Sequence, residues 1–336
     1  MGLGTHMTRA RLHSTATALL LGTCLAAGCS GAQTPDVSAA LADCKTELIV
    51  LGAGQDAGAP QIGNSQDAGW NDPALQLYPV SLGLVDHDSG ARYLFDASPQ
   101  VTAQLQLFDA LTGSSQDKGL HLDGVFLTHA HIGHYAGLIF FGREAAGARD
   151  LPVYAMPRMG AFLRENGPWG QLVELDNISI RNLSDRTEIG LSSDLSVTPV
   201  QVPHRDEYSE TVGYVIKGAE ASALFVPDID SWDAWQSEYG VSIDDMVAQV
   251  DYAFLDASFF DNHELVGRDM SEIPHPRVTE TMALFADAAT DIRKRIHFIH
   301  YNHTNPIRDP NSADTRSVAE AGFNIARRGD RICLGN

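Results

Sequence analysis

Three histidines within six residues, directly after an apolar run, constrain this chain more than any other feature. His129, His131 and His134 follow a strand-like segment at residues 124–127. Imidazoles that are buried need polar partners, and two histidines two positions apart in extended chain project to the same side. Neutral imidazole is the most common ligand for divalent metals. The cluster therefore predicts a metal site at a strand end, rather than a solvated loop in which the histidines are incidental.

Strand and helix patterns alternate through the rest of the chain and predict its fold class. Strand-like apolar runs and helix-like spacings mixed throughout, with several adjacent strand pairs, favour a layered α/β domain with two sheets. A Gly- and Asp-rich loop at 52–73 is long enough to be functional. The predicted strands are 46–51, 80–85, 92–95, 124–127, 178–183, 195–202, 211–217, 223–226, 252–255, 295–299 and 331–334, and the predicted helices are 99–112, 230–239, 276–289 and 312–327.

The histidine motif resembles the signature of the metallo-β-lactamase superfamily. Four further segments follow in the order typical of that superfamily, at residues 92–96, 201–204, 224–228 and 296–300. Together the five motifs cover nearly all of residues 45–336. The resemblance implies an αββα sandwich, in which two mixed β-sheets are flanked by helices and metal ions lie between the sheets.

The resemblance also implies which residues hold the metals. The first site would consist of His129, His131 and His204, and the second of His134, Asp228 and His300, with Asp228 bridging both ions. Three imidazoles with an open fourth position suit catalytic zinc. His303 is an alternative to His300 as a ligand, although His300 directly ends the strand. We expect Asp96 to be a structural hydrogen-bond acceptor near the site rather than a ligand.

The second site departs from the superfamily pattern. Gly133 stands where the family has Asp, so the site lacks a carboxylate ligand and the residue that usually orients the attacking water. Asp228 is the remaining candidate for that task, and Asp206 and Glu207 are weaker ones. Two histidines and one carboxylate with open positions also suit non-haem iron. We expect one or two zinc ions, with iron as an alternative in the second site.

Other segments resemble a particular family within the superfamily, that of pyrroloquinoline quinone biosynthesis protein B (PqqB). They lie at residues 52–61, 96–99, 255–260 and 298–306. That family usually lacks two of the histidines that stand here at positions 129 and 131. The chain is therefore expected to be an exported relative of the biosynthetic protein.

Two loop histidines are candidate proton donors. His263 lies where related phosphodiesterases carry a catalytic His–Glu element, and His275 precedes a predicted helix. A surface loop is the alternative reading for each. A proton donor assists departure of the leaving group by about 10²–10⁴-fold.

The first 29 residues predict a signal peptide. Arg9 and Arg11 precede an apolar stretch at 16–27, which is too short to span a membrane as a stable helix. The small residues before Cys29 resemble a bacterial lipobox, which implies a lipid on Cys29 and a tether at residues 30–44. Ordinary signal-peptidase cleavage nearby is the alternative. We expect a periplasmic protein, anchored to the outer membrane only through that lipid.

Export places the mature chain in an oxidising compartment, where disulfides persist. Outside the signal segment only Cys44 and Cys333 remain, one before the first strand pattern and one inside the last. We favour a disulfide between them over two unpaired cysteines.

Charge restricts the partners. The chain has 23 Lys and Arg against 43 Asp and Glu, a formal net charge of −20. Nucleic-acid binding needs clustered cations, so we expect a small-molecule substrate. The predicted function is hydrolysis of an ester, phosphodiester or amide/lactam bond by metal-bound hydroxide, with Asp228, His263 and His275 as catalytic candidates. An iron-dependent oxygenase or a carrier related to pyrroloquinoline quinone maturation is the alternative.

Overall fold

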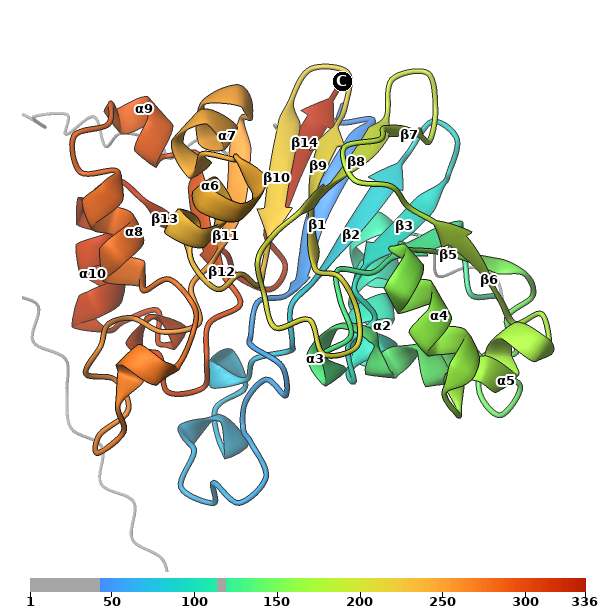
Figure 1. Ribbon diagram of the computed structural model, residues 1–336, viewed down its shortest axis with the longest axis horizontal. Coiled ribbons are helices and arrows are strands. Elements are labelled where there is room, and N and C mark those ends of the chain that lie inside the picture. The colour runs from blue at the N-terminus through green and yellow to red at the C-terminus, as the bar shows by residue number, and fades with distance from the viewer. Residues whose placement is uncertain (1–42, 114–118) are drawn as a thin grey trace, which may run out of the picture.

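Two seven-stranded sheets form the centre of the computed structural model, which describes residues 43–113 and 119–336 (Figure 1). The first sheet has the order β14 (Arg331–Gly335), β1 (Thr46–Gly52), β2 (Ser81–Asp86), β3 (Arg92–Phe95), β4 (Gly124–Phe126), β5 (Leu151–Ala155) and β6 (Ile178–Asn182). The second has the order β13 (Asn324–Ile325), β12 (Ile296–Ile299), β11 (Tyr252–Asp256), β10 (Ser222–Val226), β9 (Val212–Lys217), β8 (Ser196–Gln201) and β7 (Ile189–Gly190).

Helices cover both outer faces of this pair of sheets. One side carries α2 (Val101–Thr112), α3 (Ile132–Tyr135), α4 (Pro157–Glu165) and α5 (Trp169–Glu174). The other carries α6 (Trp232–Tyr239), α7 (Ile243–Gln249), α8 (Val278–Leu284), α9 (Thr290–Arg293) and α10 (Ala313–Glu320). Both sheets mix parallel and antiparallel pairs. The predicted αββα sandwich is therefore confirmed.

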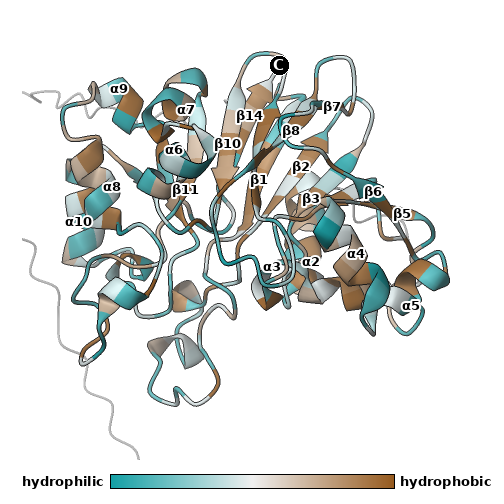
Figure 2. Cartoon of the chain, in the orientation of Figure 1, coloured by the Kyte–Doolittle hydropathy of each residue, from teal (hydrophilic) through white to brown (hydrophobic). Residues whose placement is uncertain are grey.

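The apolar side chains of the central strands contribute to two hydrophobic cores, one on each face of the sheet. Along β1, Leu48 and Val50 pack into the core between the sheets, whereas Ile49 and Leu51 pack into the core under the helices of the first sheet. Successive side chains of a strand point to opposite faces, so a strand covered on both sides must be apolar at every position. Figure 2 shows hydrophobic residues along such strands.

The direction of the strands sets the position of the site. In the first sheet β3 and β4 are parallel, and in the second sheet β10, β11 and β12 are parallel. Parallel strands end at the same edge of a sheet, and polar residues that follow them meet there. Asp96 follows β3, the histidine motif follows β4, Asp228 follows β10, and His300 follows β12.

Two predicted helices are wrong in their length. The helix predicted at 276–289 is α8, which ends at Leu284. The spacing at 312–327 predicts a single helix, but α10 ends at Glu320. Gly322 has a φ of +88°, which closes the helix. The chain then pairs with β12 as the short strand β13. The loop at 52–73 contains a short 3₁₀ turn at Ala68–Trp70, and a second 3₁₀ turn, Pro73–Leu75, begins where the loop ends.

The predicted disulfide joins Cys44 to Cys333, with their Cα atoms 5.7 Å apart. It lies beside β1 and β14, which pair antiparallel. The predicted signal peptide, Cys29 and most of the tether lie outside the described residues. Among the residues that the structure does describe, no helix is long and apolar enough to cross a membrane.

Candidate metal centre

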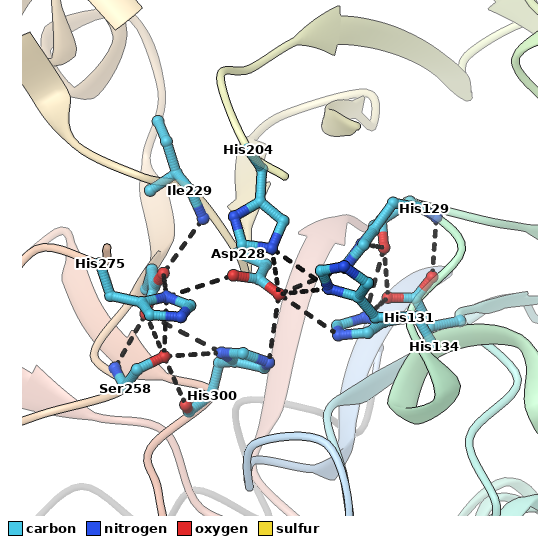
Figure 3. Close-up of polar contacts among 12 residues, drawn as sticks. His129, His131, His134, His204, Asp228, Ile229, Ser258, His275 and His300 are labelled. Atoms are coloured by element: carbon cyan, nitrogen blue, oxygen red, sulfur yellow. Dashed lines mark hydrogen bonds and ion pairs between the residues drawn. The ribbon is translucent and has the colours of Figure 1, made fainter. Parts of the chain in front are cut away.

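Five histidines converge on one carboxylate oxygen (Figure 3). The imidazole nitrogens lie between 3.2 and 3.9 Å from Asp228 Oδ2: His204 Nε2 at 3.2 Å, His129 Nε2 at 3.3 Å, His134 Nε2 at 3.7 Å, His300 Nε2 at 3.8 Å and His131 Nδ1 at 3.9 Å. Asp228 is only 3% exposed. The structure thus brings together all six residues predicted as metal ligands.

These residues form two groups around Asp228. The possible ligand atoms of His129, His131, His204 and Asp228 all lie within 4.8 Å of one another. Ligand atoms that each lie about 2.0–2.2 Å from one zinc ion are separated from one another by distances within this limit. His134 and His300, with ring centroids 5.2 Å apart, belong to a second group, which also includes Asp56. The ring of His134 adjoins the first group as well, because its centroid lies 4.2 Å from that of His129.

A polar partner holds the far nitrogen of each buried imidazole. His134 Nδ1 lies 2.7 Å from Asp96 Oδ2, His204 Nδ1 lies 2.9 Å from Asp230 Oδ1, His300 Nδ1 lies 3.0 Å from Ser258 Oγ, and His129 Nδ1 lies 3.0 Å from Thr128 Oγ1. Such partners fix the orientation of an imidazole, and a carboxylate partner raises its basicity as a metal ligand. In all four residues Nε2 is left to face Asp228.

Asp96 has the structural role that the sequence predicts. Its carboxylate accepts hydrogen bonds from Thr128 N at 2.8 Å and Thr128 Oγ1 at 2.9 Å, in addition to the contact with His134. Asp96 and His300 have φ values of +62° and +63°, a region that non-glycine residues rarely occupy. Backbone strain of this kind concentrates at functional sites.

The charges in the cluster are compatible with a metal. Burial alone would raise the pKa of the Asp228 carboxyl, but the nearby His204, His300 and His275 hold that pKa well below its usual range. Burial lowers the pKa of His129 well below the usual value for histidine, so its imidazole is neutral. Burial opposes protonation of His204 as well, but Asp228 and Asp230 outweigh it and raise its pKa to about 10. A metal that displaces this proton gains a ligand.

Several buried polar atoms of the cluster have no hydrogen-bond partner. They include His129 Nε2, His134 Nε2, His300 Nε2 and one oxygen of Asp56, a residue of the 52–73 loop. Buried polar atoms in native proteins nearly always have partners, and exceptions call for an explanation such as an ion. All four belong to the groups of residues around the Asp228 carboxylate that could hold a metal ion. The residues present therefore fit divalent metal ions with nitrogen and oxygen ligands.

His275 reaches the same carboxylate from the opposite side. Its Nδ1 lies 3.2 Å from Asp228 Oδ1 and 2.9 Å from Asp256 Oδ2. Burial would lower the pKa of His275, but Asp256 and Asp228 outweigh it and raise that pKa. His275, together with Asp230 and Arg277, lines a cavity of about 420 Å³ beside the cluster. The arrangement places the His275 imidazole, whose protonated form these carboxylates favour, between the cluster and a space that can admit a small molecule.

Of the other residues considered from the sequence, His263, His303 and Asp206 lie outside this cluster, and Glu207 contacts its edge. His263 is exposed, and its backbone N–H donates to Asp261 at 2.7 Å. His303 is half-buried against Asn302, so it is His300 that reaches Asp228. Asp206 is exposed and pairs with Arg158. Glu207, also exposed, has a carboxylate oxygen 3.5 Å from His131 Nε2.

The sequence analysis assigned no role to three carboxylates that the structure places at the site. Asp230 and Asp256 hold imidazoles in place, and Asp56 faces the second group. Asp256 could have been predicted as a site residue, because it ends a strand that is parallel to the strand before Asp228. Asp56 and Asp230 lie in a loop and before a helix, where no local pattern marks a ligand.

Comparisons with known proteins agree with this geometry. The Beta-lactamase superfamily domain family matches residues 91–301, which is more than half of the chain. Coenzyme PQQ synthesis protein B of Methylorubrum populi is 24% identical over 307 residues, covering 84% of this chain and 98% of the relative.

Two solved structures share the fold. Zinc-bound PqqB from Methylobacterium extorquens has a TM-score of 0.69 at 21% identity, covering 85% of this chain and 99% of that one. A diphosphatase of the PhnP family has a TM-score of 0.60 at 22% identity, covering 85% and 96%. With the family match and the strand-end cluster both established, the chain belongs to the metallo-β-lactamase-fold superfamily and is related to PqqB.

Proposed function

We propose that this protein is a zinc-dependent hydrolase of a small molecule. The observation that carries the proposal is the set of unpaired imidazole nitrogens around the buried carboxylate of Asp228. Imidazole and carboxylate donors suit zinc, and the zinc-bound PqqB structure has the same fold. When bound, zinc supplies a nucleophile from water at neutral pH and polarises a substrate oxygen.

The chain's own residues complete this chemistry. Asp228 is held ionised by the surrounding imidazoles, and its Oδ2 stands between the two groups of histidines. It would therefore be shared by two metal ions if both groups were occupied. Its other oxygen faces His275, so that Asp228 also fixes the position of that imidazole.

His275 is the proton donor in this proposal. It is 8% exposed and is held by Asp256, and the carboxylates that raise its pKa favour the protonated form that a donor needs. The cavity of about 420 Å³ that it lines would receive the leaving group. Ester, phosphodiester and amide or lactam bonds all release a group that needs a proton, and the proposed substrate contains one of these bonds. The net charge of −20 opposes nucleic acid.

Elemental analysis followed by a substrate panel tests the proposal. The protein is purified without added metal, its zinc and iron contents are measured, and phosphodiesters, lactones and β-lactams are assayed after zinc is restored. Zinc with turnover of one substrate class supports the hydrolase. Iron in place of zinc would favour the oxygenase alternative. Stoichiometric zinc with no turnover, and biological activity that survives His129→Ala, would favour a carrier.

A pair of histidine variants tests the assignment of the proton donor. We expect His275→Gln to lower kcat by about 10²–10⁴-fold and to remove the alkaline limb of the pH profile. His263→Gln replaces an exposed side chain and is expected to retain activity. The opposite result would assign the donor role to His263.

We further propose that the chain is exported and lipidated on Cys29. The basic and apolar segments before Cys29 support this proposal, as does the disulfide between Cys44 and Cys333, because disulfides persist in oxidising compartments. Expression in a bacterium with labelled palmitate tests it. Incorporation of label that Cys29→Ala abolishes supports the anchor, and a soluble, unlabelled periplasmic protein would indicate ordinary cleavage.

A further inference from the structure

The carboxylate of Asp56 lies beside the second group of histidines. One ligand atom each of Asp56, His134 and His300 fall within 4.8 Å of one another. Asp56 belongs to the loop that follows β1, and it is remote in sequence from both histidines. The juxtaposition is therefore a product of the fold.

The backbone around Asp56 is fixed to the strand end that carries His300. Gln55 N donates to Tyr301 O at 3.1 Å, and Tyr301 N donates to Ala53 O at 3.1 Å. Gly58 N donates to Gln55 O at 2.7 Å and closes a tight turn around Asp56, whose φ is +37°. Because Tyr301 is the neighbour of His300, these bonds set the position of the Asp56 side chain relative to that imidazole.

Gly133 shows that this loop occupies the place of a missing side chain. A Cβ added to Gly133 would lie 2.5 Å from Asp56 Cα and 2.9 Å from Asp56 O. Both are backbone atoms, which a small rotation of a side chain cannot move. The Asp that the superfamily pattern has at position 133 and the observed path of the loop are therefore mutually exclusive. The loop brings a carboxylate of its own to the same group of histidines.

The polar atoms that Asp56, His134 and His300 direct toward one another lack hydrogen-bond partners, which a bound metal ion would explain. Asp56 Oδ1, His134 Nε2 and His300 Nε2 are all buried and have no hydrogen-bond partner. The remaining nitrogen of each imidazole is already taken, by Asp96 and by Ser258. One divalent ion among the three atoms would satisfy them together.

We propose that Asp56 is a ligand of the second metal ion and replaces the carboxylate lost at Gly133. The second site is then formed by Asp56, His134, His300 and the bridging Asp228. With this carboxylate the second site has two imidazoles and two carboxylates, and the protein binds two zinc ions. The inference rests on the proposed metal-dependent function but concerns only how the second ion is held.

Zinc binding measured without any substrate tests the proposal. Apoprotein is titrated with zinc against a chromophoric chelator, which resolves the two binding steps. Loss of a partner that only orients a ligand costs about 10–100-fold in metal affinity. We expect Asp56→Ala to weaken the affinity of the second zinc-binding step by at least the upper end of that range, on the order of 100-fold. The affinity of the first step should change by less than about twofold. When cobalt replaces zinc, loss of the Asp56 ligand should appear as a change in the visible absorption spectrum of one of the two cobalt ions.

Three variants make the result specific. Asp72→Asn, an exposed acid in the same long loop, is expected to bind two zinc ions as the wild type does. His131→Ala is expected to weaken the first step instead. Asp56→Asn, which keeps the shape of the side chain, is expected to behave like Asp56→Ala, and circular dichroism confirms that each variant is folded.

The outcomes separate the two claims. Two zinc ions in the wild type and one tightly bound in Asp56→Ala support the inference. Two zinc ions with unchanged affinities in Asp56→Ala would overturn it while leaving the hydrolase proposal intact. A wild type that binds one ion would overturn it as well. A wild type that binds no metal would overturn both.

Discussion

The Asp96 carboxylate offers a sharp test of how the second metal site is organised. It is completely buried and accepts three hydrogen bonds, two from Thr128 and one from His134. In Asp96→Asn only one side-chain atom can accept. If the amide nitrogen faces His134, the imidazole must accept at Nδ1 and carry its proton on Nε2. That nitrogen lies 3.7 Å from Asp228 Oδ2 and could no longer bind a metal.

The size of the effect follows from these contacts. Loss of an orienting partner costs about 10–100-fold in metal affinity, which is roughly 1.4–2.7 kcal/mol. If instead the amide oxygen faces His134, a buried Thr128 donor is left unpaired, which costs about 1–3 kcal/mol of folding free energy. We therefore expect Asp96→Asn to weaken the second zinc-binding step and to lower stability to urea.

The matched control is Asp230→Asn, because Asp230 holds His204 in the first group as Asp96 holds His134 in the second. In a chelator competition experiment Asp230→Asn should weaken the first step and spare the second. The side chain of Asp230 is 34% exposed, so its effect should be the smaller of the two. The reasoning is refuted if Asp96→Asn weakens both steps equally, or changes the second by less than twofold.

Three further predictions concern stability. The Cys44–Cys333 disulfide closes a loop with a separation of 289 residues, so replacing both cysteines with serine should lower the free energy of unfolding in urea by about 2–4 kcal/mol; a change below about 1 kcal/mol would contradict this. Burial lowers the pKa of His297 to about 4, so stability should fall as pH drops from about 6.5 towards 4, by on the order of 3 kcal/mol. His297→Phe should remove that dependence, and acid unfolding curves that coincide with those of the wild type would exclude it. Removal of zinc by a chelator should lower Tm by roughly 5 °C or more, since a ligand at 100 times its Kd contributes about 2.7 kcal/mol; an unchanged Tm would argue against a structural contribution from the metal.

The strands were predictable because strands that are buried on both faces appear in the sequence as short apolar runs. The strand predicted at 92–95 agrees with β3 at both ends, and other predicted strands agree to within one or two residues. The predictions missed α4 and α5, which have nine and six residues and carry polar residues within the helical pattern. Short amphipathic helices have too few turns for their period to be clear.

The metal site was predictable where ligands follow strands. His129, His131 and His134 stand in one local motif, and the family resemblance supplies the order of the remaining strand ends. Asp56 could not be predicted in this way. Its place beside His300 depends on hydrogen bonds between a loop after the first strand and the backbone of Tyr301. Local residue patterns contain no information about such a pairing.

The covalent link between the first and last strands makes the intervening chain a closed ring. A single backbone cut anywhere between Cys44 and Cys333 leaves the two pieces joined through sulfur. Arg268 lies in an exposed stretch, next to a glycine with positive φ, and is a natural place for trypsin to nick. The nicked protein would migrate as one species on a non-reducing gel and divide into two fragments only after a thiol is added. Because the disulfide holds the two ends of the domain with Cα atoms 5.7 Å apart, the domain is suited to circular permutation, with new ends opened in that stretch.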